Sequence, residues 1–108
     1  MTVTWLSIPD VVEQIGVGVS KVRRLIEDRH LLARRIDGIW YVPDVFIRDG
    51  QPLPELRGTL ILLADAGFSD DDALDWLLDE EDLLGTSPIV ALREGRKAEV
   101  RRTAQALA

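Results

Sequence analysis

The segment from Ser7 to Tyr41 constrains the fold more than any other part of this chain. It contains two short amphipathic helical patterns, a glycine-bearing turn between them, and two β-prone runs around an Asp-Gly pair. A short glycine turn between two amphipathic helices is typical of a helical pair packed at a steep angle. The order therefore predicts two packed helices followed directly by a β ribbon.

The two helical patterns begin and end at residues suited to those places. Ser7, Pro9 and Asp10 form a helix start, because a serine N-cap, an early proline and an early acid all suit a first turn. The turn is Gly16-Val17-Gly18, and the second helix is expected at about 19–28. Apolar residues recur at helical spacing at Ile8, Val11, Val12 and Ile15, and again at Val19, Val22, Leu25 and Ile26.

A β hairpin is expected directly after the second helix. The runs 31–36 and 39–42 flank Asp37-Gly38, and both turn residues tolerate the positive φ of a tight hairpin. Pro43 ends the second run because it lacks a backbone donor. We expect a wing over residues 31–42, and a winged helix-turn-helix over residues 1–48.

Charge is distributed unevenly along the chain. The net charge is −6, and residues 51–108 carry all of it, with six basic and twelve acidic side chains. Residues 20–35 instead hold six basic side chains against Glu27 and Asp28. Such a local patch can bind DNA in an acidic protein, because the free energy comes from counterions released at the contacted phosphates.

The candidate DNA contacts lie on the second helix and the wing. The N-terminal part of the second helix of such a motif faces base edges in the major groove. Successive strand residues point to opposite faces, so only one wing arginine is expected to face the same DNA, at phosphate or sugar. The alternative is that the basic run is simply a solvated helix face. The candidates are Ser20, Lys21, Arg23, Arg24, Arg34 and Arg35.

The second half of the chain predicts a helical bundle. Asp49–Pro54 has the composition of a turn and linker. Leu56–Ala66 is a predicted helix with Gly67 as its C-cap. Further helix starts are expected at Ser69, at residues 85–88 and at Arg96. We therefore expect a mainly α fold, in which a helical domain over residues 55–108 packs on the winged helix-turn-helix.

The first half carries a family resemblance. The segments Trp5–Val17 and Ile39–Pro43 resemble the excisionase-like and MerR-like winged helix-turn-helix pattern. The whole chain is similar to small actinobacterial winged-helix DNA-binding proteins, a group that includes a mycobacterial substrate of a membrane Ser/Thr kinase. The segments Gly16–Val22 and Leu60–Trp76 carry this closer likeness. The resemblance implies a cytoplasmic DNA-binding regulator. Because the sequence starts almost at the first helix, we do not expect the kinase regulation that a long N-terminal tail would support.

The second half resembles another family. Residues 57–108 are similar to the C-terminal helical domain of the Xre/MbcA/ParS antitoxins. The resemblance is carried by the order of Ala66-Gly67-Phe68, Trp76-Leu77, 83–89 and 92–95. That resemblance implies dimerisation and binding of a protein partner. The alternative is that the same apolar residues simply build a small helical core.

Several classes of function lack a signal in the sequence. There is no cysteine, the single histidine has no evident nucleophile partner, and no phosphate-binding or dinucleotide-binding loop follows Gly16-Val17-Gly18. The acidic runs at 70–72 and 79–82 lack the alternation of a calcium loop. We expect no enzymatic activity, cofactor, metal or membrane segment, and a cytoplasmic location.

The sequence therefore predicts a sequence-specific or architectural protein that binds double-stranded DNA and regulates transcription. The alternative is an antitoxin-like interaction module whose C-terminal helices bind a partner. The oligomeric state is left open, because no coiled-coil heptad is present to supply a dimer.

Overall fold

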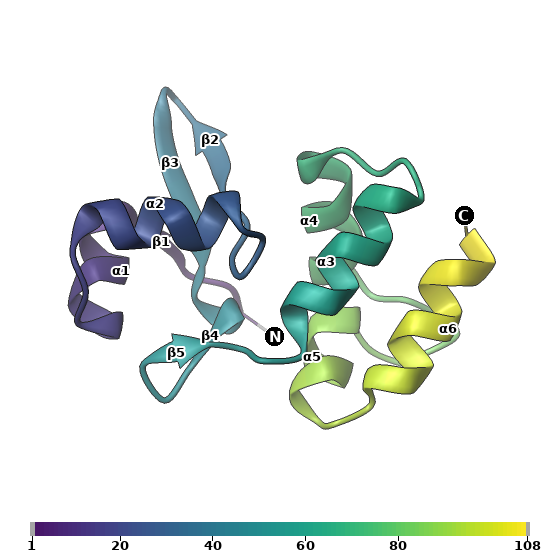
Figure 1. The fold of residues 1–108 in the computed structure, drawn as a ribbon. Coiled ribbons are helices and arrows are strands. Elements are labelled where there is room, and N and C mark those ends of the chain that lie inside the picture. The colour runs from purple at the N-terminus through teal and green to yellow at the C-terminus, as the bar shows by residue number, and fades with distance from the viewer. Residues whose placement is uncertain (1, 108) are drawn as a thin grey trace. The chain divides into compact units, whose positions relative to one another are not determined.

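The computed structural model describes residues 2–107 and shows a chain of two compact units, which divide between Pro54 and Glu55 (Figure 1). The elements of the first unit are β1 (Trp5–Ser7), α1 (Ile8–Ile15), α2 (Val19–Glu27), β2 (Arg34–Ile36), β3 (Ile39–Pro43), the 3₁₀ helix η1 (Asp44–Phe46), β4 (Ile47–Arg48) and β5 (Gln51–Pro52). Those of the second unit are α3 (Leu56–Asp65), α4 (Asp70–Leu78), α5 (Pro88–Arg93) and α6 (Lys97–Leu107). The expected fold class is confirmed: a winged helix-turn-helix is followed by a helical bundle.

The sheet of the first unit has a strand that the sequence analysis did not predict. Its order is β1-β3-β2, and all neighbours are antiparallel. β1 pairs along β3, with Trp5 opposite Pro43 and Ser7 opposite Tyr41. Three residues are too few for an alternating pattern to be recognised, and Ser7 also serves as the N-cap of α1.

The predicted wing began three residues too early. β2 starts at Arg34, whereas Leu31, Leu32 and Ala33 are almost completely buried outside any strand. These three residues connect α2 to the wing through the interior. Their apolar character reflects burial of a connecting segment, which the sequence pattern alone does not distinguish from a strand.

The expected linker after the wing contains a second small hairpin. β4 and β5 pair antiparallel, with Ile47 opposite Pro52. The turn between them is Asp49-Gly50, and both residues have positive φ (54° and 72°). The Asp-Gly pair thus forms a tight turn here as it does in the wing. The prediction missed it because each strand has only two residues and the second contains a proline.

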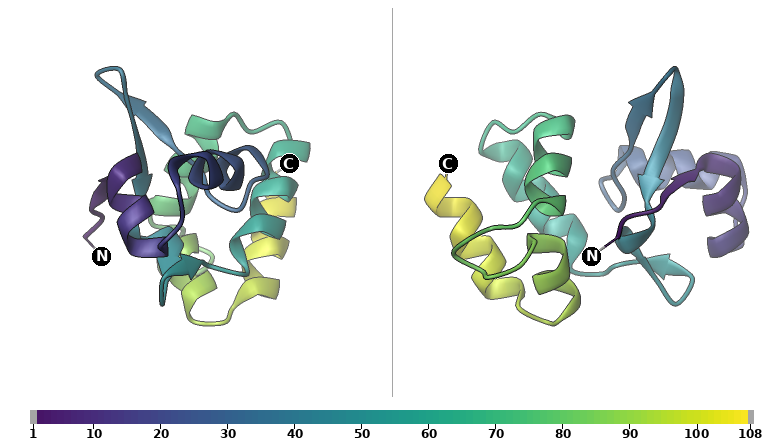
Figure 2. Two further views of the ribbon diagram at one scale, coloured as in Figure 1. Left: turned by 60° about the vertical axis from the view of Figure 1, so that its left-hand side comes forward. Right: turned by 180° about the vertical axis from the view of Figure 1, so that it is seen from behind.

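The second unit is a bundle of four helices. α3 packs against α4 and α6, and α5 also packs against α4 and α6 (Figure 2). Its fully buried side chains come from all four helices and include Leu63, Leu74, Leu92 and Val100. Ser69 caps α4 as predicted, since its Oγ accepts a hydrogen bond from the Asp72 amide at 3.1 Å.

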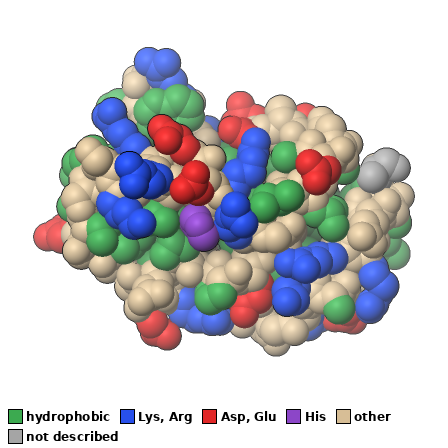
Figure 3. Space-filling model, in the orientation of Figure 1, with side chains coloured by type: hydrophobic (Ala, Val, Ile, Leu, Met, Phe, Trp, Pro, Cys, Tyr) green, Lys and Arg blue, Asp and Glu red, His purple; other side chains and the backbone are tan. Residues whose placement is uncertain are grey.

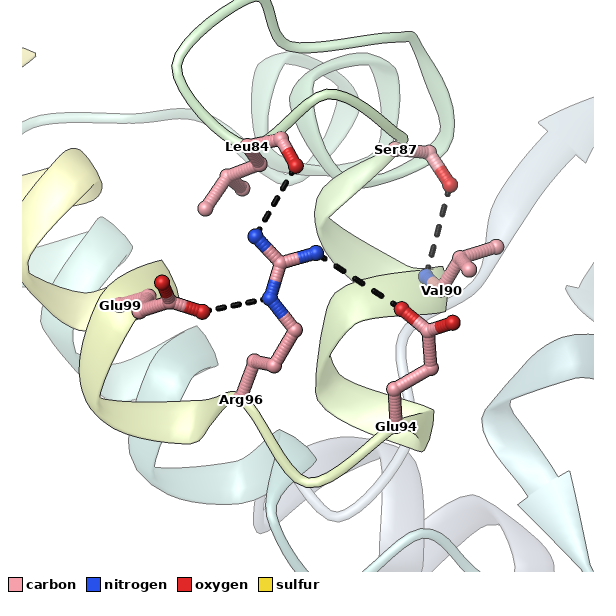
Figure 4. A network of polar contacts seen from close by, with 6 residues as sticks. All are labelled: Leu84, Ser87, Val90, Glu94, Arg96 and Glu99. Carbon is pink, nitrogen blue, oxygen red and sulfur yellow. Dashed lines mark hydrogen bonds and ion pairs between the residues drawn. The ribbon is translucent and has the colours of Figure 1, made fainter.

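One arginine organises the junction between α5 and α6. The Arg96 guanidinium donates to the Leu84 carbonyl at 3.0 Å and to the Glu99 carboxylate, and it lies 3.7 Å from Glu94 (Figure 4). The hydrogen bond from Arg96 lowers the pKa of Glu99. The loop before α5 is thereby joined to the start of α6.

Within residues 2–107, no helix combines the length and apolar character needed to cross a membrane.

Candidate nucleic-acid interface

The first helix and the turn after it hold α2 in place. The Ser7 hydroxyl accepts from the Asp10 amide at 3.3 Å, and the Asp10 carboxylate accepts from the Ser7 amide at 3.2 Å. This reciprocal capping box fixes the start of α1. Gly16 ends the helix with a left-handed conformation (φ 78°). Val11 of α1 and Val22 of α2 are both fully buried where the two helices pack.

The outer face of α2 is set by the burial of Val22. Each residue of an α-helix turns by about 100°, so side chains two positions from Val22 point away from the interior. Ser20 and Arg24 occupy these two positions, and both are exposed. Lys21 and Arg23 are exposed on opposite flanks of the helix. All four predicted residues of α2 are therefore exposed. Ser20 and Arg24 point outward, and Lys21 and Arg23 point to the two sides of the helix.

The end of α2 directs the chain into the wing. Arg29 adopts a left-handed conformation (φ 63°), which is uncommon for a residue with a side chain. The His30 amide bonds to the Leu25 carbonyl, and the Arg29 amide bonds to that of Ile26. These two bonds form a Schellman motif. The backbone amide of His30 thus completes the cap of α2.

The two wing arginines lie on opposite faces of the sheet. Arg34 is opposite Tyr41 in the register, and its guanidinium lies over the Trp5 ring, 5.5 Å from the centroid. Arg35 is opposite Trp40 and lies over that ring at 5.9 Å. Both distances suit a cation–π contact. Each guanidinium is therefore held by an aromatic ring on its own face.

Only the face with Arg35 is turned toward α2. A hollow of about 300 Å³ separates α2 from this side of the wing. The residues that line it are Ile8, Arg23, Ile26, Glu27, Ala33 and Trp40. The hollow therefore has Arg23 on its helix side and Trp40 on its wing side, and Arg35 lies over the ring of this tryptophan.

Two tryptophans that support the wing arginines, Trp5 and Trp40, were not among the residues predicted from the sequence. Trp40 is 49% exposed and lies under the Arg35 guanidinium. The Asp37-Gly38 turn fixes the pairing of the residues around it, so the Arg35–Trp40 pair could have been read from the sequence. Trp5 could not, because its strand was not recognised.

The charge on this surface is predominantly positive. Figure 3 shows Lys and Arg side chains over α2 and along the hairpin, with acidic side chains beside them. Glu27 and Asp28 are the exposed acids at the end of α2. No three side chains of the metal-binding types gather at a possible metal site in the described range 2–107. The arrangement suits a polyanion better than a cation.

Comparisons with known proteins agree for both units. Residues 1–47 match the family model described as the winged helix-turn-helix domain of the DNA-binding protein Rv2175c. Residues 53–108 match the Rv2175c C-terminal domain, described as of unknown function. The second match is to the same family as the first, and the likeness of residues 57–108 to antitoxin domains stays a prediction.

A similar protein and a similar structure were found for almost the whole chain. The DNA-binding protein Rv2175c of Mycobacterium tuberculosis (strain ATCC 25618 / H37Rv) is 34% identical over 114 residues, which cover 94% of this chain and 78% of that protein. The NMR structure of Rv2175c has a TM-score of 0.88 and 33% identity, and the match covers 97% of this chain and 81% of that one.

Proposed function

The chain belongs to the family of the DNA-binding protein Rv2175c, and we propose that it binds double-stranded DNA through α2 and the β2–β3 wing. The observation that carries the proposal is that α2 and the adjoining wing face carry cations on either side of one hollow. Arg23 lines this hollow, Arg35 stands on the wing beside it, and Arg24 lies on the outer face of the same helix.

The geometry of α2 divides its residues between bases and phosphates. When a recognition helix lies in the major groove, its outermost side chains meet base edges. Ser20 and Arg24 hold these positions, and arginine bonds guanine through two hydrogen bonds. Lys21 and Arg23 lie on the flanks, where the two phosphate backbones border the groove. We therefore assign base contacts to Ser20 and Arg24, and phosphate contacts to Lys21 and Arg23.

The wing supplies a backbone contact in this proposal. Arg35 faces the side of α2, and its guanidinium is held against Trp40. A cation at this place positions the protein on the duplex without reading sequence. Arg34 lies on the opposite face, over Trp5, and we assign it no contact with the same DNA segment.

The proposed role is that of a non-catalytic, cytoplasmic regulator of transcription. The similar protein from Mycobacterium tuberculosis is named a DNA-binding protein, which supports DNA as the partner of this chain. Residues 1–47 of this chain match the winged helix-turn-helix domain of that family. A contact made by Arg24 at base edges would give the sequence preference that a regulator needs.

The proposal is tested by titrating duplex DNA of random sequence into labelled protein. We expect the backbone amides of α2 and of the wing to shift first. The double variant Arg23→Ala plus Arg24→Ala should bind at least about eightfold more weakly at 0.1 M salt, because one lost phosphate contact alone accounts for that factor. Arg48→Ala, which removes an exposed cation of the same unit outside α2 and the wing, is the control. Unchanged affinity and salt dependence in the double variant would refute the proposal.

A protein-binding role for the second unit is the second candidate. One observation favours it: Leu83 is 72% exposed in the loop before α5, which Arg96 joins to α6. An exposed leucine on a fixed loop suits a partner contact. Capture of a partner by the full chain but not by Leu83→Ser would support this role, and equal capture by both would remove the loop from consideration.

A further inference from the structure

The outer face of α6 carries a second group of cations. Val100 and Ala104 are fully buried and set the inward direction of the helix. Arg102 lies two residues after Val100 and therefore points away from the interior, while Lys97 and Arg101 lie along one flank. Lys97 and Arg102 are exposed, and Arg101 is half-buried.

The single acid of α6, Glu99, lies beside Arg102 and away from Lys97 and Arg101. Glu99 is on the opposite flank from Arg101, because it precedes Val100 whereas Arg101 follows it. Its carboxylate accepts a hydrogen bond from Arg96 and also feels the charge of Arg102. Within α6 itself, Lys97, Arg101 and Arg102 thus give three positive charges, and the one carboxylate, Glu99, borders them at Arg102 and is hydrogen-bonded to Arg96.

A glycine of α3 makes room for one of these cations. A Cβ atom at Gly58 would lie 2.0 Å from Nη2 of Arg101 and 3.0 Å from its Cζ. The Arg101 guanidinium therefore lies directly over the α3 backbone, in space that any other residue at 58 would fill. Glycine lowers the stability of a helix interior relative to alanine. Here the absence of a side chain at 58 leaves open the space that the Arg101 guanidinium occupies.

Arg101 as a whole is half-buried, and one of its donors is enclosed within the bundle. Its Nε is buried and has no hydrogen-bond partner in the described structure. Arginine presents a planar fork of donors that matches phosphate oxygens.

We propose that Lys97, Arg101 and Arg102 form a second, sequence-independent contact with the phosphate backbone of duplex DNA. The proposal rests on the DNA-binding function proposed above, because binding through the first unit raises the effective concentration of phosphates near the tethered second unit. It assigns a role to a domain described only as of unknown function.

The composition of the face favours DNA over a membrane. The residues between the cations are Ala98 and Gln105, both exposed. A helix that binds a lipid surface needs large apolar side chains on the bound face in addition to cations, and this face has none. Charge complementarity to a polyanion is the property that remains.

Removal of the exposed cations gives the first test, in the full-length chain with duplex DNA. Each lost phosphate contact lowers the slope of log affinity against log salt by about 0.9. Lys97→Gln plus Arg102→Gln should therefore lower the slope by about 1.8 and weaken binding about 60-fold at 0.1 M salt. Arg102→Gln and Gln51→Glu each lower the net charge by one, and Gln51 is exposed outside α2, the wing and α6. Only Arg102→Gln should change the slope.

Gly58→Ala gives the second test, because it separates binding from stability. The new methyl group must displace the Arg101 guanidinium, which can move because it is the end of a flexible side chain. Alanine also favours the helix, so the urea midpoint should be unchanged or higher. Affinity for duplex DNA should nevertheless fall about eightfold at 0.1 M salt, the effect of one lost phosphate contact.

The outcomes separate the two proposals. If Arg23→Ala plus Arg24→Ala weakens binding but the α6 variants and Gly58→Ala bind like the wild type, the second contact is refuted and the proposed function stands. If the wild type binds no duplex DNA, the proposed function fails and the second contact fails with it. If the α6 variants lose binding only to vesicles of anionic lipid, the face is a membrane contact and this proposal is overturned.

Discussion

Arg34 and Arg35 test the proposed DNA contact with a pair of matched substitutions. They are adjacent, carry the same charge, and each lies over a tryptophan ring at a similar distance, 5.5 Å and 5.9 Å. They differ in the sheet face that they occupy. Replacing either by alanine removes one positive charge and one cation–π contact, and the comparison then tests the two sheet faces.

The expected size of the effect follows from counterion release. If Arg35 contacts one phosphate, its loss lowers the slope of log affinity against log salt by about 0.9. If the variant and the wild type bind equally at 1 M salt, this difference in slope makes the variant about eightfold weaker at 0.1 M salt and about fourfold weaker at 0.2 M. Arg34→Ala should leave the slope unchanged, because Arg34 points away from the face that borders α2.

The assay is fluorescence anisotropy of a labelled duplex at several salt concentrations. Urea unfolding of each variant checks that the wing is intact, since an exposed cation–π contact is worth only about 0.5–1 kcal/mol. Equal slopes for the two variants would show that the wing face does not select the DNA contact. A larger change in the slope for Arg34→Ala than for Arg35→Ala would reverse the assignment of the two faces.

Three further predictions concern stability. Gly38→Ala should destabilise the protein by about 1 kcal/mol in urea unfolding, because alanine at φ 81° is strained although its Cβ would meet no atom within 4 Å; no change would mean that the turn can readjust. Val22→Ala should cost about 2 kcal/mol by the same assay, since it removes two methyl groups from a fully buried site, and a cost near zero would contradict the packing described for α1 and α2. The lowered pKa of Glu99 means that its pairing with Arg96 stabilises the fold above the unfolded pKa of about 4.3 and loses this effect as the pH falls through the folded pKa. Glu99→Gln should therefore lower the free energy of unfolding at about pH 7 and leave it unchanged well below the folded pKa, and an equal loss at both values would count against the pairing.

The helices were predicted well because their signals are local. Ser7 and Ser69 cap α1 and α4 through bonds to residues only three positions away, so the information needed lies within one turn. The Asp37-Gly38 turn is local in the same sense, since its backbone conformation follows from the two residues themselves. Each of these features could be recognised without knowing what packs against it.

The missed features depend on partners far away in the sequence. β1 is a strand only because residues 41–43 lie beside it, and three residues cannot show this by themselves. The run from Leu31 to Ala33 has the composition of a strand, but the left-handed turn at Arg29 carries it into the interior. The place of Arg101 over Gly58 joins two helices more than 40 positions apart, so no pattern in the sequence indicates it.

The acidic character of the chain explains why position should matter more than the number of cations in the proposed contacts. With a net charge of −6, the protein as a whole is repelled by DNA, and attraction begins only within the screening length of about 8 Å at physiological ionic strength. A cation that must first be ordered loses much of its gain to entropy. The Arg35 guanidinium already lies over the Trp40 ring, and the Arg101 guanidinium already lies in the space that Gly58 leaves open. Such fixed cations retain more of the free energy of counterion release, so a few of them can support binding where a larger number of mobile ones on an acidic chain would not.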